Sequence, residues 1–231
     1  MYIKAITFQG SRESNEDAFC IVNEENIIRA VVCDGVGSYR HAGEAAHYVA
    51  EALCNDLNKS LFEIICECHN NLVNNHEKLG FTTLAAVEST GNNKFTIYNV
   101  GDSRIYVLGY KSLKQLTKDH TNEHKLRKTY AKYYDQVESE KMARYFSVLE
   151  AALGHKLDIY ESEYELESDS ELLIIGSDGA YEALEKYNSM YLSSQFITPR
   201  ERAQFLFEHL ELMDREDALE DNATLLVIYD E

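Results

Sequence analysis

Aspartates stand at the ends of several apolar runs that have the length and composition of buried β-strands. Asp34 follows residues 30–33, Asp221 precedes residues 223–227, and Asp178 ends a third such run. Strands hold side chains more rigidly than loops do, so these carboxylates could be aimed at one point. Like carboxylates repel one another unless protons or cations neutralise them, and no cluster of basic residues accompanies them. A divalent metal site is therefore predicted, and oxygen ligands favour Mg²⁺ or Mn²⁺.

Glycine follows two of these aspartates, in Asp34-Gly35 and Asp178-Gly179. Glycine allows the chain to turn sharply or to bring a carbonyl group close to a ligand. A single Asp-Gly pair is more often an ordinary turn than a site. The combination of both pairs with Asp221 is what favours a functional interpretation.

The elements that could position these residues follow from the periodicity. Short apolar or alternating runs bounded by glycine, aspartate or asparagine predict about nine strands or more. These runs cover residues 2–8, 18–23, 27–33, 82–88, 94–100, 104–108, 159–166, 172–175 and 224–229. Helical spacing predicts two helices over residues 43–79, with a break near 58–60, and another from Pro199 to about Leu212. Because strands come in groups and helices in blocks, an α+β fold with antiparallel sheets is favoured over a doubly wound parallel sheet.

Further motifs lie around the three aspartates. In chain order they are Arg12-Glu13-Ser14-Asn15-Glu16-Asp17, Asp34-Gly35-Val36-Gly37 with Gly43-Glu44, Phe81-Thr82-Thr83, Val100-Gly101-Asp102-Ser103-Arg104-Ile105-Tyr106, Leu116-Thr117-Lys118-Asp119-His120, Ser177-Asp178-Gly179 and Asp221-Asn222-Ala223-Thr224. This order resembles the successive motifs of the 2C-type metal-dependent serine/threonine protein phosphatases, in their compact bacterial form. One Asp-Gly pair has almost no specificity, whereas the ordered set is highly specific.

The resemblance implies a four-layer α-β-β-α sandwich, with two packed antiparallel β-sheets flanked by helices and a metal site in a cleft at one end. It implies a single domain over residues 1–231 with a flap-like insertion at about residues 120–146. The basic side chains of that insertion would attract an acidic or phosphorylated partner. A solvated loop of mixed charge is an equally good interpretation of the same residues.

Position by position, the resemblance also implies roles for site residues. Asp34 would bridge two metal ions, and the carbonyl of Gly35 would bind the second ion. Asp178 and Asp221 would complete the first, and Glu16 would hold metal-bound water. The cofactors implied are thus two Mn²⁺ or Mg²⁺ ions.

Two further residues carry implied roles. Asp102 resembles the residue that contributes to a third, weaker metal site in this family. Arg12 matches the arginine that binds the substrate phosphate, which suits a guanidinium group. The structural alternative for Arg12 is a salt bridge to Asp17 or Glu16.

The activity implied is hydrolysis of phosphoserine and phosphothreonine in proteins by a metal-activated water. The general acid is open, because Val36 stands where some relatives have a histidine. His41 could approach the cleft, although a histidine at the start of a helix is more often a surface or capping residue. Glu182 replaces an aspartate that assists the third metal in many relatives. The alternative function is a weakly active or inactive phosphatase-like protein that binds phosphoproteins or a regulatory partner.

The amino-acid composition limits which binding partners and which cellular compartment we expect for this protein. The formal net charge of -18 disfavours nucleic acid and anionic lipid as partners. The odd number of cysteines and the absence of a predicted leader or membrane span lead us to expect a cytoplasmic protein. We also expect a monomer. Expected partners are phosphorylated proteins and an opposing serine/threonine kinase. Two soft-metal alternatives, at Cys66-Glu67-Cys68-His69 and at the pair His120 and His124, lack the remaining ligands that such sites require.

Overall fold

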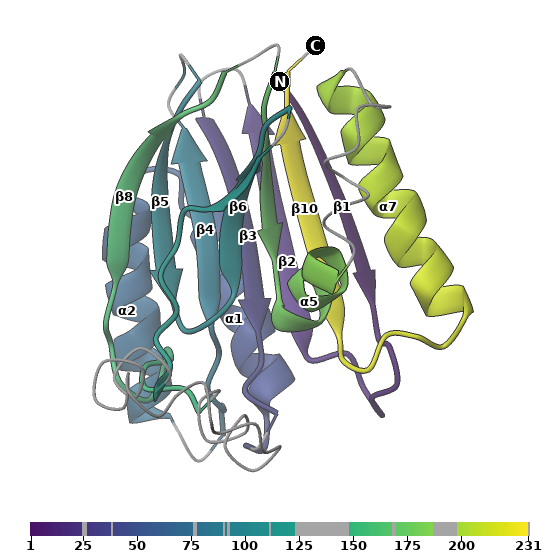
Figure 1. Cartoon of the computed structure of the whole chain (residues 1–231). Coiled ribbons are helices and arrows are strands. Elements are labelled where there is room, and N and C mark those ends of the chain that lie inside the picture. Colours follow the sequence, from purple (N-terminus) through teal and green to yellow (C-terminus); the bar gives the residue numbers. More distant parts are fainter. Residues whose placement is uncertain are drawn as a thin grey trace, which may run out of the picture.

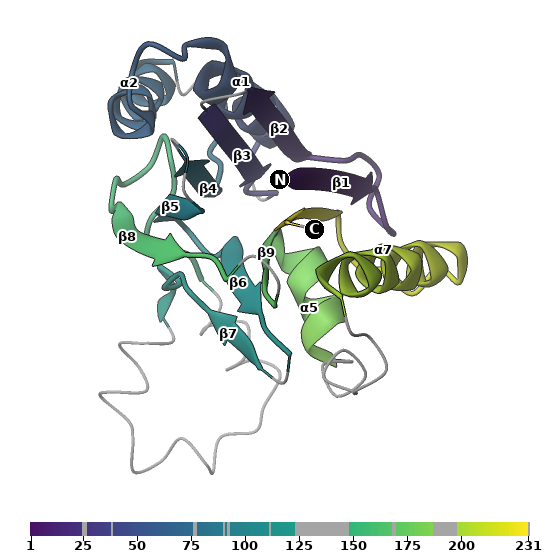
Figure 2. The same ribbon diagram turned by 90° about the horizontal axis from the view of Figure 1, so that it is seen from above.

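Two antiparallel β-sheets packed face to face form the centre of the molecule, and helices cover both outer faces (Figures 1 and 2). The computed structural model describes residues 1–24, 27–37, 39–75, 78–89, 91, 93–110, 112–122, 148–167, 170–186 and 198–230. Each sheet has five strands in the described part of the chain. The fold is therefore a four-layer α-β-β-α sandwich of the α+β class, as predicted.

The first sheet has the order β1-β10-β9-β6-β7. These strands are β1 (Tyr2–Phe8), β10 (Ala223–Tyr229), β9 (Leu172–Gly176), β6 (Arg104–Leu108) and β7 (Leu113–Gln115). The N-terminal strand pairs with the last strand, and Tyr2 lies opposite Tyr229. Within the described residues, every pair of neighbouring strands in the two sheets is antiparallel.

The second sheet has the order β2-β3-β4-β5-β8. Its strands are β2 (Asp17–Glu24), β3 (Ile27–Asp34), β4 (Leu84–Ser89), β5 (Lys94–Val100) and β8 (Tyr160–Glu165). Asp17 at the start of β2 lies directly opposite Asp34 at the end of β3. The register therefore brings two motifs of the sequence side by side at one end of the sandwich.

Four helices are described, two on each outer face (Figure 2). On the second sheet lie α1 (Ala42–Asn55) and α2 (Leu61–Asn74), and on the first sheet lie α5 (Asp178–Lys186) and α7 (Pro199–Arg215). Helices α2 and α7 each begin with a capping box, formed by Ser60 with Glu63 and by Thr198 with Glu201. Among the described residues, no helix has the length and apolar character needed to cross a membrane.

The hydrophobic core has three layers, one between the sheets and one under each pair of helices. Strand β3 shows how alternation builds them, because Ala30 and Val32 face the other sheet. The intervening Val31 and Cys33 face the helices. Since the strand is covered on both faces, it is apolar almost throughout rather than alternating with polar residues.

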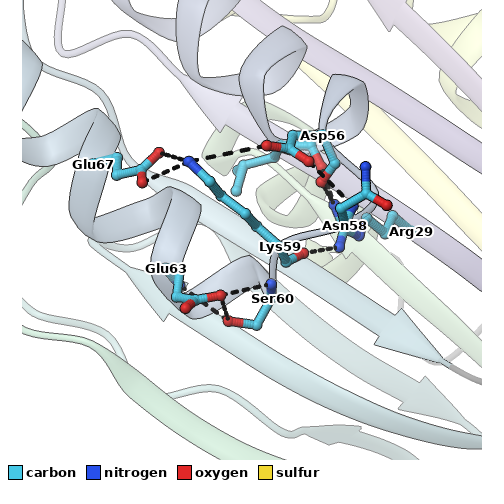
Figure 3. A network of polar contacts seen from close by, with 8 residues as sticks. Arg29, Asp56, Asn58, Lys59, Ser60, Glu63 and Glu67 are labelled. Carbon is cyan, nitrogen blue, oxygen red and sulfur yellow. Dashed lines mark hydrogen bonds and ion pairs between the residues drawn. The ribbon is translucent and has the colours of Figure 1, made fainter.

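A buried arginine ties the helices to the second sheet (Figure 3). The side chain of Arg29 on β3 is almost fully buried and donates to the carbonyl groups of Leu53, Asp56 and Lys59, at 2.8, 2.9 and 2.6 Å. Its Nε donates to Glu88 Oε2 at 2.7 Å. Arg29 thus satisfies backbone acceptors at the end of α1 and in the turn before α2, where a helix leaves carbonyl groups unpaired.

The structure corrects the sequence prediction at three elements. Strand β7 and helix α5 were not predicted, and the second predicted helix ends at Asn74 rather than near residue 79. The other predicted strands and helices are present with shifts of a few residues at their ends. Residues 123–147 lie outside the part of the chain that the structure describes. They include nearly all of the insertion predicted at about residues 120–146.

Candidate functional site

An acidic pocket opens at the end of the sandwich where β3 and β9 finish, the lower end in Figure 1. It has a volume of about 440 Å³. All of the predicted site residues line it: Arg12, Glu16, Asp34, Gly35, Asp102, Asp178 and Asp221. They come from the β1–β2 loop, the end of β3, the β5–β6 turn, the start of α5 and the loop before β10. Antiparallel pairing places these ends together although they are far apart in sequence.

The main chain fixes Asp34 at the end of β3. Its N–H donates to Thr83 Oγ1 at 3.1 Å, and its carbonyl accepts from Thr83 N–H at 2.8 Å and from the Thr82 hydroxyl at 2.9 Å. Thr83 Oγ1 also lies 2.6 Å from the hydroxyl of Ser103. These bonds set the direction in which the carboxylate of Asp34 enters the pocket.

Gly35 lies where the chain leaves β3 and approaches α1. A Cβ atom here would lie 2.7 Å from the carbonyl carbon of Ala42 and 2.9 Å from the carbonyl oxygen of Glu16. The N–H of Gly35 donates to that Glu16 oxygen at 3.2 Å. Close backbone approach therefore explains the glycine and links the first two acidic motifs.

Asp102 occupies the tight turn between β5 and β6. Gly101 before it has φ +97°, a conformation that favours glycine. The N–H of Gly101 donates to His120 Nδ1 at 3.0 Å, and the His120 N–H donates to the Gly101 carbonyl at 2.9 Å. Burial, reinforced by Asp178 and Asp119, raises the pKa of Asp102 to about 7.

Asp178 and Asp221 each accept a hydrogen bond from the next residue in the chain. Gly179 N–H donates to Asp178 Oδ1 at 2.6 Å, and Asn222 N–H donates to Asp221 Oδ1 at 2.8 Å. Asp178 is the first residue of α5, where the helix dipole favours a negative charge. Burial and the nearby Asp221 nevertheless raise the pKa of Asp178.

The pocket concentrates negative charge. The pKa of Asp34 is raised well above its ordinary value, first by burial and then by Asp17, Asp178, Asp102 and Asp221. Carboxylates this close are ionised together only when cations lie nearby, and otherwise some of them stay protonated. The donor set is made of oxygen atoms, which fits a hard divalent ion better than zinc or copper. Within the described residues, no group of three or more acidic, histidine or cysteine side chains is arranged so that it could already hold a metal ion.

Arg12 is the one cationic side chain among the described residues that line the pocket. Its side chain is 55% exposed, and Nη2 forms an ion pair with Asp221 Oδ2. The sequence offered, as an alternative to phosphate binding, a salt bridge from Arg12 to Asp17 or Glu16. The partner of Arg12 is instead Asp221, so this alternative was wrong about the partner. Its hydrogen bond with Asp221 raises the pKa of Arg12, which keeps the guanidinium charged.

Two residues that hold the pocket together were not among the site residues predicted from the sequence. Asp17 is buried and accepts from Ser177 Oγ at 2.7 Å, which joins β2 to the residue before Asp178. Asn222 accepts from Glu16 N–H at 2.9 Å and donates to the carbonyls of Gln9 and Ser14, at 2.8 and 2.9 Å. Asp17 directly follows Glu16 in the sequence, and Asn222 directly follows Asp221. These positions next to predicted site residues could have identified both.

A partly buried polar network links the elements that carry Asp102 and Asp178. Arg104 on β6 binds Asp119 through Nε and Nη2, with the shortest distance 2.6 Å. Its Nη1 donates to Glu185 at 2.9 Å, and its guanidinium lies 4.0 Å from the ring centroid of Tyr181. Tyr181 and Glu185 follow Asp178 on α5, so Arg104 connects the strand after Asp102 to the helix that carries Asp178.

Other histidines and cysteines considered in the sequence lie away from the pocket lining. His41 precedes α1 with φ 63°, makes no side-chain cap and pairs with Glu44 at 3.0 Å. Cys68 packs in the core under α1 and α2, and His69 accepts from Gly154 N–H at 3.2 Å. His124 lies outside the described residues.

Comparisons with known proteins agree with this architecture. The family model described as Protein phosphatase 2C matches residues 9–221. The serine/threonine phosphatase stp of Listeria welshimeri is 33% identical over 138 residues, covering 51% of this chain and 54% of that protein. The stp protein of Listeria monocytogenes serovar 1/2a matches to the same extent. The chain thus spans about half the length of the curated relatives it matches.

Solved structures share the fold. The serine/threonine phosphatase Stp1 from Staphylococcus aureus gives a TM-score of 0.76 at 22% identity, over 99% of this chain and 94% of that chain. The S. agalactiae serine/threonine phosphatase gives a TM-score of 0.76 at 20% identity, over 100% of both chains. The fold match extends over the whole chain, and the family model covers most of it. This protein belongs to the protein phosphatase 2C family.

Proposed function

We propose that this protein is a metal-dependent phosphatase that hydrolyses phosphoserine and phosphothreonine in other proteins. The observation that carries the proposal is the acidic pocket at the end of the sandwich, in which Arg12 stands among several aspartates. Membership of the protein phosphatase 2C family supports the same reaction. The names of the Listeria relatives point to the same substrate class.

The carboxylates of the pocket would hold Mn²⁺ or Mg²⁺. Asp34 would be shared by two ions, Asp178 and Asp221 would help to hold the first, and the Gly35 carbonyl would help to hold the second. Glu16 would hold a water at this centre, and Asp102 would contribute to a third ion. When bound, the ions supply a nucleophilic water and stabilise the negative charge that develops on the phosphoryl group. Buried, mutually repelling carboxylates support this assignment, because cations would relieve their repulsion.

The protein's own groups orient the substrate. Arg12 reaches the pocket from its exposed rim, and its planar guanidinium can bind two phosphate oxygens at once. No histidine is among the described residues that line the pocket. We therefore assign protonation of the leaving serine or threonine oxygen to water rather than to a side chain.

The wider setting is part of the same proposal. We propose a single domain with a flap-like insertion at about residues 120–146, acting as a monomer in the cytoplasm. Its substrates would be phosphorylated proteins, and a serine/threonine kinase would oppose it.

The test is release of inorganic phosphate from phosphoserine and phosphothreonine peptides, with Mn²⁺, with Mg²⁺ and with excess EDTA. We expect metal-dependent release that falls by at least about 100-fold in Asp34→Asn, because the substitution removes a charged metal ligand. The matched control is Asp214→Asn on α7, which lies outside the pocket lining and should keep full activity.

Circular dichroism and the melting temperature would show whether Asp34→Asn is still folded. Full activity in a folded Asp34→Asn protein would refute the assignment of the site. A folded, metal-loaded wild type that binds phosphopeptides but releases no phosphate would support the alternative function, a phosphatase-like binding protein.

A further inference from the structure

A second groove adjoins the catalytic pocket. It has a volume of about 390 Å³ and shares Arg12, Asp178 and Asp221 with the pocket. The ion pair between Arg12 and Asp221 therefore stands at the boundary between the two spaces. A peptide whose phosphate lies beside Arg12 would have neighbouring residues within reach of this groove, since an extended chain advances about 3.3 Å per residue.

The groove has an apolar floor formed by three elements. Ala183 comes from α5, Met213 comes from α7, and Leu219 comes from the loop before β10. All three are buried members of the core layer between these helices and the first sheet. A floor held by the core is preformed, so binding a side chain there does not require ordering a loop.

The rim of the groove is acidic. Glu182 on α5 and Glu220 in the loop before β10 both line it and are exposed. Neither carboxylate has an ion-pair partner among the described residues. Arg12, the one cationic side chain among the described residues that line the groove, is already paired with Asp221. The aspartates shared with the pocket have a role in the proposed metal site, and the family resemblance places Glu182 at the position of an aspartate that assists the third metal. Glu220 is therefore the rim carboxylate that is left to face a ligand.

Apolar floor and acidic rim together fit one kind of side chain. Lysine and arginine have a methylene stem that packs on apolar surface and a charged head that stays near solvent. A carboxylate at the rim would bind that head, whereas an acidic neighbour in the substrate would be repelled.

We propose that this groove is a specificity subsite that binds a lysine or arginine within about three residues of the phosphorylated serine or threonine. The inference rests on the proposed function, which it deepens by naming the substrate class. Glu220 is its specificity-determining residue, and it belongs to no part of the assigned metal site.

The experiment uses phosphothreonine peptides that carry, at each flanking position in turn, lysine, norleucine or glutamate. Norleucine keeps the stem of lysine without its charge. We expect the wild type to prefer lysine over norleucine at the favoured position by roughly three- to tenfold in kcat/KM, the range of a partly exposed ion pair. In Glu220→Lys the preference should fall below about twofold, while hydrolysis of p-nitrophenyl phosphate stays unchanged, because that ester is too small to reach the groove.

The matched control is Glu24→Lys, which makes the same change in net charge at an exposed position at the end of β2. It should keep the wild-type preference. If Glu24→Lys lowers the preference as much as Glu220→Lys does, the effect is a long-range field and the subsite is refuted. Equal kcat/KM for the three peptides in the wild type would also refute it.

Binding provides a readout that is independent of turnover. Fluorescence anisotropy with the same peptides in EDTA compares the wild type with Glu220→Lys. Preferential binding of the lysine peptide that Glu220→Lys abolishes would support the subsite even if no phosphate were released, so that only the proposed catalysis would fail. Turnover without any peptide preference in either assay would refute the subsite and leave the catalytic proposal intact.

Discussion

Gly35 and Gly43 both approach Glu16, but the space around them differs. A Cβ atom on Gly35 would lie 2.7–2.9 Å from backbone atoms of Ala42 and Glu16. A Cβ atom on Gly43 would lie 3.4–3.6 Å from atoms of Glu16, which is ordinary packing contact. Only the first glycine is required by its surroundings, although the sequence motif contains both.

This difference predicts opposite effects of the same substitution. We expect Gly35→Ala to lower the free energy of unfolding by about 1–3 kcal/mol, because backbone atoms must move to admit the methyl group. Gly43→Ala lies inside α1 and should leave stability unchanged or raise it by up to about 1 kcal/mol. Urea denaturation of both variants measures this, and equal stability of the two would contradict the argument.

At the residue scale, the sequence predicted which side chains gather in the pocket but not which of them pair. Arg12 and Asp221 are 209 positions apart, and no local pattern relates them. The sequence also gave no indication that Asn222 clamps the loop carrying Glu16. Such contacts depend on how β1 and β10 are aligned, and that register is set by the whole sheet.

At the element scale, Arg29 is the clearest joint between a sheet and its helices. It lies on a strand that is otherwise apolar, and its guanidinium donates to carbonyl groups at the end of α1 and in the turn that follows (Figure 3). It also donates to the carboxylate of Glu88. A buried charge is tolerated only when its hydrogen bonds are satisfied, and here the planar fork of arginine provides enough donors.

Removing the hydrogen bonds of Arg29 should lower the free energy of unfolding substantially. We expect Arg29→Met to destabilise the protein by about 3–5 kcal/mol, because Glu88 and several carbonyl groups lose their buried partner. The control is Lys59→Ala, which removes an exposed ion pair to Glu67 and should cost at most about 1 kcal/mol. Thermal and urea unfolding would measure both, and a smaller loss for Arg29→Met than for Lys59→Ala would overturn this account.

The elements that the sequence failed to predict share a physical reason. Helix α5 has only 9 residues and begins with Asp-Gly, which is typical of a turn. It forms because Ala180, Tyr181 and Leu184 pack against the first sheet. Strand β7 has 3 residues, too few to show alternation, and exists by pairing with β6. Tertiary contacts decide both cases, whereas longer strands and helices carry their own periodic signal.

At the scale of the whole molecule, the hydrophobic core and the acidic pocket occupy different regions of the sandwich. Three apolar layers run through the body, and the charged groups of the pocket gather at one end. The four-layer architecture could be predicted from the ordered motifs. The position of the groove beside the pocket could not, because it depends on where α5, α7 and the loop before β10 meet.

The pairing of β1 with β10 also brings residue 1 close to residue 230. Tyr2 lies opposite Tyr229, and the amino group of Met1 lies 3.5 Å from Asp230. Figures 1 and 2 show both chain ends together, and in Figure 1 they lie at the end of the sandwich opposite α5. The two ends could therefore be joined, and the chain opened elsewhere, without changing which strands lie side by side.

A circular permutant should exploit this proximity of the two ends. Joining residues 230 and 1 by about six glycine and serine residues, and opening the chain at Gly91, should preserve the fold, because a flexible linker of that length spans neighbouring strands. Gly91 lies between β4 and β5, and a Cβ atom added there would meet no atom within 4 Å. We expect an unchanged circular dichroism spectrum and metal-dependent phosphate release within about threefold of the wild type. A permutant that fails to fold would show that the chain order itself, and not only the final contacts, is needed to assemble the sandwich.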